Sequence, residues 1–216
     1  DKWLKRKNYH ADEGEGMDNY KVGPSRGCGG LGIFNGGDCY VSQNWATQRH
    51  IASGPVRTAF EITYAPWDCG SGVKIAETRR MSLDAGSHFT RFESRFTLTG
   101  ATSIAGGPGL DISAKNLHNG TVTTSPEQGW LANYEPGQPK VGSIATAIVL
   151  PTNGTISTDK VENVYLLGTL TSDKPFVWYA GAGWSGAGNF VKPDYWNAYV
   201  SSFAAGLKTP LLVTVK

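Results

Sequence analysis

The chain has 216 residues, a formal net charge of +2, 28 glycines and 7 tryptophans, and 18% of its residues are charged. The small, scattered basic excess argues against a nucleic-acid partner, and the lack of an apolar run long enough to cross a bilayer argues against a membrane partner. Many glycines and aromatic residues are typical of turn-rich β proteins that handle sugars, and a chain of this length can form a single domain. We therefore expect residues 1–216 to form one β domain.

The first feature in chain order is the segment Tyr9–Pro24, which we predict to be a functional loop because its glycines exclude a long helix or regular strand. It mixes acids, bases and phenols: Tyr9, His10, Asp12, Glu13, Glu15, Asp18, Tyr20 and Lys21. Loops that hold such groups on a rigid scaffold often carry binding or catalysis, although a solvated acidic loop is the simpler alternative. A third interpretation is that the carboxylates and His10 bind a divalent cation, but their spacing matches no recognised metal motif.

The segment from Leu31 to Val41 predicts a hairpin, because two short apolar stretches flank a glycine-rich turn. The cysteines of the chain are Cys28, Cys39 and Cys69. They lack the paired spacing of a zinc site, and their odd number allows one disulfide and one free thiol. The sequence leaves the pairing open.

Three later segments, which begin near Val56, Ile75 and Phe89, predict strands in which an apolar face alternates with charged positions. If the sheet curves, we expect the charged rows to line one concave groove that binds an acidic sugar through bidentate contacts from arginine to carboxylate. The alternative is a solvent-facing set of cross-strand ion pairs. The candidate substrate-binding residues in these rows are Arg57, Glu61, Arg79, Arg91 and Glu93.

The rest of the chain predicts short strands at regular spacing, with a turn at Gly106–Gly109, and this pattern favours a sandwich or barrel. One helix is expected near the C-terminal end, where Pro193 suits a first helical turn. We expect it to pack on the sheet edge through residues at helical spacing: Tyr195, Tyr199, Phe203 and Leu207.

Several blocks of the chain together resemble one protein family. These blocks are Tyr9-His10, Gly14–Asp18, Tyr20–Pro24, Arg26–Gly30, Gly54–Thr58, Tyr64–Trp67 and Tyr179–Ser185. They are similar to secreted carbohydrate-utilisation proteins called domain of unknown function 4861, which are found beside polysaccharide lyases and unsaturated glucuronyl hydrolases. Family members are longer, so we expect the chain to be the C-terminal part of one, with an absent N-terminal segment of the same protein as a partner.

The resemblance implies an all-β fold, an antiparallel β-sandwich of the galactose-mutarotase-like type, to which the helical pattern adds one C-terminal helix. It also implies a secreted or periplasmic location and an acidic oligosaccharide as the partner. The related activity is the dehydration of a uronic acid at the end of an oligosaccharide, a β-elimination that gives a 4,5-unsaturated uronate. No cofactor is expected apart from the divalent cation considered above.

Such an elimination needs a group that neutralises the carboxylate, a base for the C5 proton and an acid for the leaving oxygen. The arginines of the strands supply the first, and Arg26 joins the substrate-binding candidates. His10 is the candidate base, since a histidine has an ordinary pKa of about 6.5. Tyr20 or Lys21 would donate the proton if the site lowers its pKa. Trp184, in a glycine-rich context, is expected to form a pocket wall that contacts the substrate.

Two other functions stay open. The first is a non-catalytic sugar-binding sandwich, in which Trp184, Tyr64 and Trp67 stack on sugar rings. The second is a mutarotase or epimerase on the same scaffold. Turnover of a uronate-terminated oligosaccharide, followed by product analysis, distinguishes them.

Overall fold

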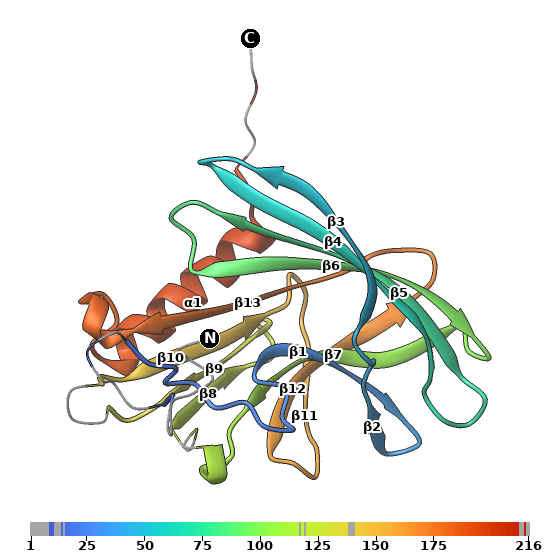
Figure 1. Cartoon of the computed structure of the whole chain (residues 1–216), viewed down its shortest axis with the longest axis horizontal. Helices are drawn as coiled ribbons and strands as arrows, with labels where there is room; N and C mark the ends of the chain where they lie inside the picture. Colours follow the sequence, from blue (N-terminus) through green and yellow to red (C-terminus); the bar gives the residue numbers. More distant parts are fainter. Residues whose placement is uncertain are drawn as a thin grey trace.

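The computed structural model describes residues 9–10, 14, 16–116, 118, 120–137, 141–211 and 214. Within them the chain forms two packed antiparallel sheets and one α-helix (Figure 1), which confirms the predicted all-β sandwich with a C-terminal helix. The larger sheet has eight strands in the order β3-β4-β5-β6-β13-β10-β9-β8, and the smaller sheet has five in the order β11-β12-β7-β1-β2.

The strand boundaries follow the turn signals of the sequence. The larger sheet contains β3 (Trp45–Ser53), β4 (Arg57–Asp68), β5 (Lys74–Asp84), β6 (Phe89–Thr99), β8 (Thr121–Ser125), β9 (Trp130–Tyr134), β10 (Ile144–Val149) and β13 (Phe176–Trp184). The smaller sheet contains β1 (Cys28–Asn35), β2 (Asp38–Tyr40), β7 (Ser103–Asp111), β11 (Thr155–Thr158) and β12 (Asn163–Thr171). The strands β1 and β2 confirm the predicted hairpin, whose turn residues Gly36 and Gly37 have φ angles of +61° and +90°.

The main core lies between the two sheets. Side chains from the inner face of the larger sheet, such as Phe96 and Trp178, pack against Ile33, Leu110 and Leu166 of the smaller sheet. Burying each of these large side chains contributes roughly 1.5–3 kcal/mol. The alternation of side chains along β5, β6 and β13 thus defines an inner face, which looks toward the smaller sheet, and an outer face.

The segment Gly106–Gly109 is not a turn, as the sequence suggested, but the middle of β7. A Cβ on Gly107 would clash with the carbonyl oxygen of Leu166, and a Cβ on Gly109 would lie 2.8 Å from the ring of Tyr165. These glycines let neighbouring chain segments approach one another closely, which is a known use of glycine inside a strand.

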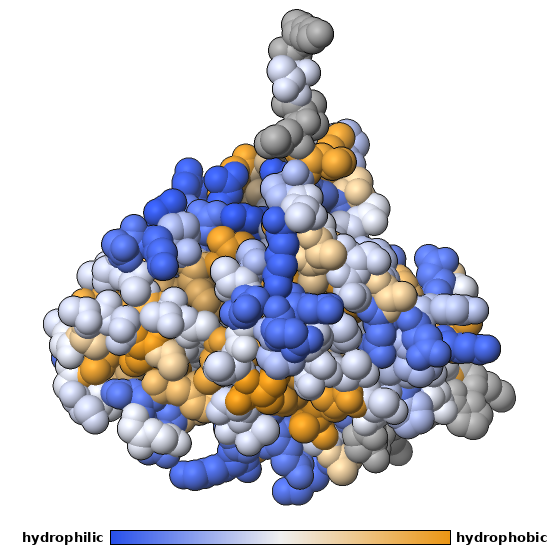
Figure 2. All heavy atoms as spheres, turned by 180° about the vertical axis from the view of Figure 1, so that it is seen from behind, coloured by the Kyte–Doolittle hydropathy of each residue, from blue (hydrophilic) through white to orange (hydrophobic). Residues whose placement is uncertain are grey.

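The helix α1 (Pro193–Lys208) exists where the sequence predicts it, but it packs on the face of the larger sheet, against β9 and β10, and not on the sheet edge. Its fully buried side chains are Trp196, Val200 and Ala204, one position along from the predicted stripe, while Tyr195 is 54% exposed. The indole N–H of Trp196 donates to the carbonyl oxygen of Thr146 at 3.1 Å, which fixes the helix on the outer face. The face seen from behind shows hydrophilic residues between hydrophobic patches (Figure 2).

Two further findings bear on the chemistry of the chain. Cys28, Cys39 and Cys69 are all free thiols. Among the described residues, no helix combines the length and the apolar character needed to cross a membrane.

Candidate functional site

A buried arginine is the centre of the candidate site. Arg79 of β5 lies on the inner face of the larger sheet, and its side chain is only 10% exposed. Its Nε donates hydrogen bonds to Glu77 Oε1 at 2.8 Å and to Ser94 Oγ at 3.2 Å. The guanidinium carbon lies 5.0 Å from the ring centres of Tyr64 and Trp178, so cation–π contacts add to the ion pair. Four side chains therefore fix the position of this cation.

The same contacts leave the outer end of the guanidinium free. Neither Nη nitrogen of Arg79 hydrogen bonds to a described residue. Neither belongs to the fully buried polar atoms that lack a partner, so both keep some exposure. Two Nη–H groups in one plane match the two oxygens of a carboxylate. The arginine is thus fixed by the protein through Nε and presents its Nη nitrogens to a ligand.

Arg79 lines a cavity of about 410 Å³, which we call the arginine cavity. Arg26 lines it as well, so the structure brings two of the predicted substrate-binding residues together. The backbone N–H of Arg26 donates to Asn163 Oδ1 at 2.8 Å, which anchors this residue beside the smaller sheet. Trp45, which is 54% exposed, adds an aromatic wall. The other described lining residues are Gly30, Leu31, Ser42, Gln43, Asn44 and Tyr64.

Tyr64 supplies an ionisable hydroxyl to the arginine cavity. Burial raises the pKa of Tyr64, the charge of Arg79 opposes that shift, and the charge of Glu77 adds to it. The net effect is an upward shift, so the phenol is protonated at neutral pH. The cavity therefore holds a cation for a carboxylate and, beside it, a group that can exchange a proton.

A second cavity, of about 590 Å³, lies between the opening segment and the larger sheet, and we call it the tryptophan cavity. Trp184, which is 48% exposed, forms one wall, and its indole N–H donates to the carbonyl oxygen of Val141 at 2.6 Å. Tyr20 comes from the opening segment, so two more predicted site residues meet here. The remaining described lining residues are Gly16, Met17, Asn19, Cys28, Ile144, Thr146, Ala182 and Gly183.

The two cavities lie along one strand. Trp178 of β13 touches Arg79, whereas Ala182 of the same strand lines the tryptophan cavity. Between them, Ala180 packs tightly against Gly29 of β1. At about 3.3 Å per residue, the four steps from Trp178 to Ala182 span roughly 13 Å. The two cavities are thus separate sites, divided by the first residues of β1.

Two ionisable groups of the tryptophan cavity are held in their protonated forms. Burial is the main cause that raises the pKa of Tyr20, and the charges of Cys28, Glu135 and Asp111 add to it. The predicted proton donation by Tyr20 assumed a lowered pKa, and the shift has the opposite direction. Burial likewise raises the pKa of Cys28 to about 12, so this thiol is neutral near pH 7.

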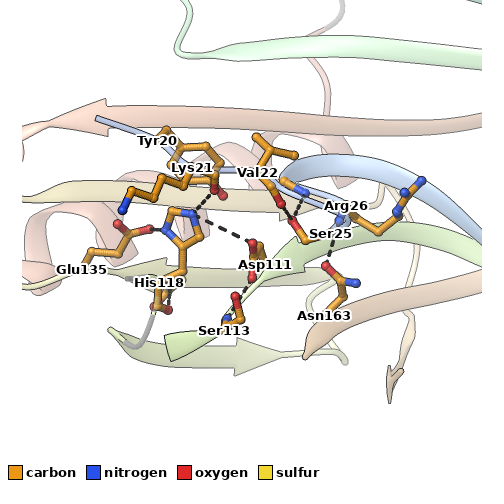
Figure 3. Close-up of polar contacts among 12 residues, drawn as sticks. Tyr20, Lys21, Val22, Ser25, Arg26, Asp111, Ser113, His118, Glu135 and Asn163 are labelled. Atoms are coloured by element: carbon orange, nitrogen blue, oxygen red, sulfur yellow. Dashed lines mark hydrogen bonds and ion pairs between the residues drawn. The ribbon is translucent and has the colours of Figure 1, made fainter. Parts of the chain in front are cut away.

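A buried polar cluster holds the opening segment in place beside this cavity (Figure 3). His118, only 1% exposed, places Nδ1 2.7 Å from Glu135 Oε1 and Nε2 2.5 Å from the carbonyl oxygen of Lys21. The ring centres of His118 and Tyr20 are 4.2 Å apart, and Asp111 Oδ2 lies 4.0 Å from Nε2. His118 thereby ties Lys21 and Tyr20 to the sandwich.

The protonation state of His118 follows from these partners. Burial by itself lowers the pKa of His118, but the hydrogen bonds to Glu135 and to the Lys21 carbonyl, with the charges of Glu135 and Asp111, outweigh burial and raise it. Because a carbonyl oxygen only accepts hydrogen bonds, Nε2 carries a hydrogen. Both ring nitrogens are thus occupied within the protein, so His118 positions its neighbours and is not a free base.

The other charged strand residues lie on the outer face, so the predicted single groove does not form. Arg57 binds Asp84 through two hydrogen bonds of 2.5 and 2.7 Å, and Arg91 pairs with Glu93 at 2.7 Å. Glu61 pairs with the neighbouring Arg49 at 2.9 Å. The side-chain alternation of each strand separates these residues from Arg79, because Glu77 and Arg79 share the face of Ile75. On the outer face, the structure therefore matches the alternative expectation, a set of solvent-facing ion pairs.

The remaining predicted catalytic residues, His10 and Lys21, are close in sequence to the tryptophan cavity but do not line it. His10 places Nδ1 2.5 Å from the carbonyl oxygen of Asp18, and its ring lies 4.2 Å from the ring of Tyr9. Neither His10 nor Lys21 is among the described residues that line the arginine or the tryptophan cavity. Within the part of the chain that the structure describes, no group of three or more His, Cys, Asp or Glu residues is arranged to hold a metal ion. Three acids of the predicted cation set lie outside the described residues: Asp12, Glu13 and Glu15.

Sequence reasoning missed the residues that hold Arg79 in place. From the sequence alone, Glu77, Ser94 and Trp178 have no role beyond their positions in predicted strands. One signal was present, because Glu77 and Arg79 alternate in register with Ile75 and Met81. Two opposite charges on an apolar face indicate a buried ion pair.

Comparison with known proteins places the chain in a family. The family model described as "Domain of unknown function (DUF4861)" matches residues 1–213. The chain belongs to this family. The expected resemblance is therefore confirmed, and the two cavities are candidate sites of a DUF4861 domain.

Among curated proteins, the DUF4861 chain is 33% identical over 216 residues to "Uncharacterized protein P7" of Formosa agariphila. The match covers 96% of the chain and 52% of that protein, so the chain spans about half the length of this relative. The solved structures that resemble it include the GH36 α-galactosidase AgaA A355E of Geobacillus stearothermophilus, with 10% identity, a TM-score of 0.40, and coverage of 71% of this chain and 30% of that one. Another is the galactosidase domain of the α-galactosidase-sucrose kinase AgaSK, with 12% identity, a TM-score of 0.39, and coverage of 82% and 34%. At these TM-scores the likeness extends to neither a site nor an activity.

Proposed function

We propose that this domain is carbohydrate-active and takes an acidic, uronate-containing oligosaccharide whose carboxylate binds in the arginine cavity. The observation that carries the proposal is the state of Arg79, which is fixed at Nε by Glu77 and Ser94 while neither Nη nitrogen hydrogen bonds to a described residue. Arg26 adds a second positive charge to the same cavity. The exposed ring of Trp45 offers a platform for the apolar side of a sugar ring.

We propose further that the reaction is a β-elimination that gives a 4,5-unsaturated uronate. Arg79 neutralises the carboxylate and stabilises the negative charge that develops when the C5 proton is removed. Water in the cavity accepts the C5 proton, and the C5–H electrons form the C4–C5 double bond. The C4–O bond breaks, the leaving oxygen takes a proton from Tyr64 and departs as water or as a sugar hydroxyl, and solvent returns a proton to Tyr64. The reaction is neutral in redox terms, so it needs no redox cofactor.

Tyr64 is the group best placed in this cavity to move a proton, because its ring lies against the guanidinium of Arg79 and it lines the cavity. In the proposed reaction it donates the proton to the leaving oxygen. Burial raises its pKa, as it does that of Tyr20, but the adjacent positive charge of Arg79 stabilises the phenolate that remains, whereas the charges around Tyr20 are negative. The catalytic roles predicted for His10, Tyr20 and Lys21 stay predictions, and none of the three is among the described residues of the arginine cavity. The chain spans about half the length of its curated relative. The activity of a whole family member, including any protein group that helps to remove the C5 proton, is therefore part of the same proposal.

Binding is tested first, by isothermal titration calorimetry with methyl glucuronide and methyl galacturonide as probes. Arg79→Lys keeps the charge but loses the planar fork, and we expect it to weaken uronate binding about tenfold or more. Arg91→Lys is the matched control, because Arg91 lies on the outer face in an ion pair with Glu93. Equal affinities for Arg79→Lys and the unchanged protein would remove the carboxylate site.

Turnover is tested with uronate-terminated oligosaccharides, by the ultraviolet absorbance of the unsaturated product and by its mass. Loss of one water identifies a dehydratase, and chain cleavage without loss of water identifies a lyase. Tyr64→Phe should abolish turnover while it keeps most of the affinity. Binding without any turnover would instead support the sugar-binding module, and inversion of a sugar centre without unsaturation would support the epimerase.

A further inference from the structure

We infer that the tryptophan cavity is a second ligand site, distinct from the arginine cavity, and that it takes one neutral sugar unit. It lies on the other side of the first residues of β1, where Ala180 and Gly29 pack together. No residue named for either cavity lines both, so a ligand in one does not require the other. The inference is therefore independent of the carboxylate site.

The wall of this cavity suits the apolar face of a sugar ring. Trp184 is 48% exposed, yet its ring is fixed by the hydrogen bond from Nε1 to the Val141 carbonyl oxygen. A rigid, half-exposed aromatic ring loses little conformational entropy on binding and offers a flat apolar platform. Ile144 and Ala182 extend the apolar surface beside it.

Among the described residues, two buried hydroxyls in the same wall have no partner but each other. The hydroxyls of Tyr20 and Thr146 are close enough to interact, which slightly offsets the rise that burial causes in the pKa of Tyr20, but neither makes a hydrogen bond of normal geometry to any described residue. Thr146 is 1% exposed, and both residues line the cavity. Unpaired buried hydroxyls are uncommon in native proteins and usually point to a bound water or ligand group that satisfies them. The hydroxyl groups of a sugar can both donate to and accept from such partners.

The charge around the cavity favours a neutral ligand. None of its described lining residues carries an ionised side chain, and the Cys28 thiol is protonated near neutral pH. The charges of Glu135 and Asp111 are felt at Tyr20, where they oppose an additional negative charge. A carboxylate would thus find no cation in this wall, in contrast to the arginine cavity.

The test is calorimetric titration with the neutral methyl glycosides of galactose, xylose and rhamnose, with methyl glucuronide and tetramethylammonium as charged probes. In the Arg79→Lys variant, whose carboxylate site is weakened, we expect a neutral glycoside to bind more tightly than either charged probe. Trp184→Ala should weaken that binding roughly tenfold or more, because the platform is lost. Tyr195→Ala is the matched control, since it removes a 54% exposed aromatic side chain from helix α1, outside the described lining of both cavities, and should leave neutral binding unchanged.

Thr146→Val separates a ligand role from a structural one. Valine keeps the shape and removes a buried hydroxyl whose one described contact is the Tyr20 hydroxyl, so the melting temperature should stay the same or fall only slightly. Binding of the neutral glycoside should fall about three- to tenfold. The inference is overturned if no neutral glycoside binds, if tetramethylammonium or the uronide is preferred at this site, or if Trp184→Ala and Thr146→Val leave the affinity unchanged. Uronide binding that depends on Arg79 belongs to the first proposal and does not bear on this one, which stands or falls on the neutral glycosides.

Discussion

Replacing Glu77 with leucine tests whether a buried ion pair holds Arg79 in its binding position. The Glu77 side chain is fully buried and that of Arg79 is 10% exposed. Without Glu77, the Nε of Arg79 keeps only Ser94 as a partner. Removing one member of a buried ion pair costs about 3–5 kcal/mol, because the remaining charge is uncompensated. We expect about 3 kcal/mol for Glu77→Leu, the lower end of that range, because water in the arginine cavity can solvate the free Nη nitrogens.

The reverse change, Arg79→Leu, should cost more, about 4–5 kcal/mol. It leaves a carboxylate that has no contact with the cavity, and Glu77 Oε2 is already buried without a hydrogen-bond partner in the described chain. The double variant Glu77→Leu/Arg79→Leu should be less destabilised than either single variant, because it leaves no unpaired charge. It should also be folded and unable to bind a uronate.

The assay is urea unfolding followed by tryptophan fluorescence, with the free energy of unfolding extrapolated to water. Arg57→Leu serves as the control, because Arg57 and Asp84 form an exposed ion pair and we expect no measurable change. The reasoning is refuted if the two single losses simply add in the double variant, or if Glu77→Leu costs less than about 1 kcal/mol.

The remaining predictions concern pH and backbone. The pKa of His118 is raised in the folded chain, so its contribution to stability is complete below the unfolded pKa of about 6.5 and is lost as the pH rises through the folded value. The free energy of unfolding should therefore fall with rising pH in that window, and His118→Gln should flatten the curve; a parallel curve for the variant would contradict the assigned contacts. Gly206→Ala, in the helix with no atom near the added Cβ, should raise the stability by about 0.5–1 kcal/mol, whereas Gly107→Ala should lower it or prevent folding. Thermal unfolding measures both, and a stable Gly107→Ala protein would contradict the close approach of strands β7 and β12.

The sequence predicts the fold class because alternation and turn residues are local signals. The strand with Arg57 and Glu61 and the helix at Pro193 both follow from their own residues. The role of Gly106–Gly109 does not, because a glycine in a turn and a glycine at a close strand contact have the same sequence signature. Only the position of Leu166 on the neighbouring strand decides between the two.

Four of the predicted site residues line the two candidate cavities, and their roles stay predictions. Arg26 and Arg79 share one cavity, and Tyr20 and Trp184 share another, although each pair is far apart in the chain. The sequence does not show which face of the larger sheet packs against the smaller sheet. The buried Arg79 therefore cannot be told from the exposed strand arginines by sequence alone. His118 illustrates the same limit, since its partners Glu135 and Lys21 lie 17 and 97 residues away.

Arg57 and Arg79 show what separates a structural arginine from one prepared for a ligand. Arg57 uses both Nε and Nη2 to bind the two oxygens of Asp84, so a carboxylate of the protein already fills its fork. Arg79 uses only Nε to bind Glu77. The aromatic rings of Tyr64 and Trp178 contact the guanidinium group and fix its position without occupying its other N–H donors. A carboxylate bound to Arg79 through the two Nη nitrogens would complete the set of hydrogen bonds that the chain leaves unmade. The position of that missing partner, in a polar cavity shared with Arg26, is why we propose an anionic sugar group for the inner face and not for the arginine-rich outer one.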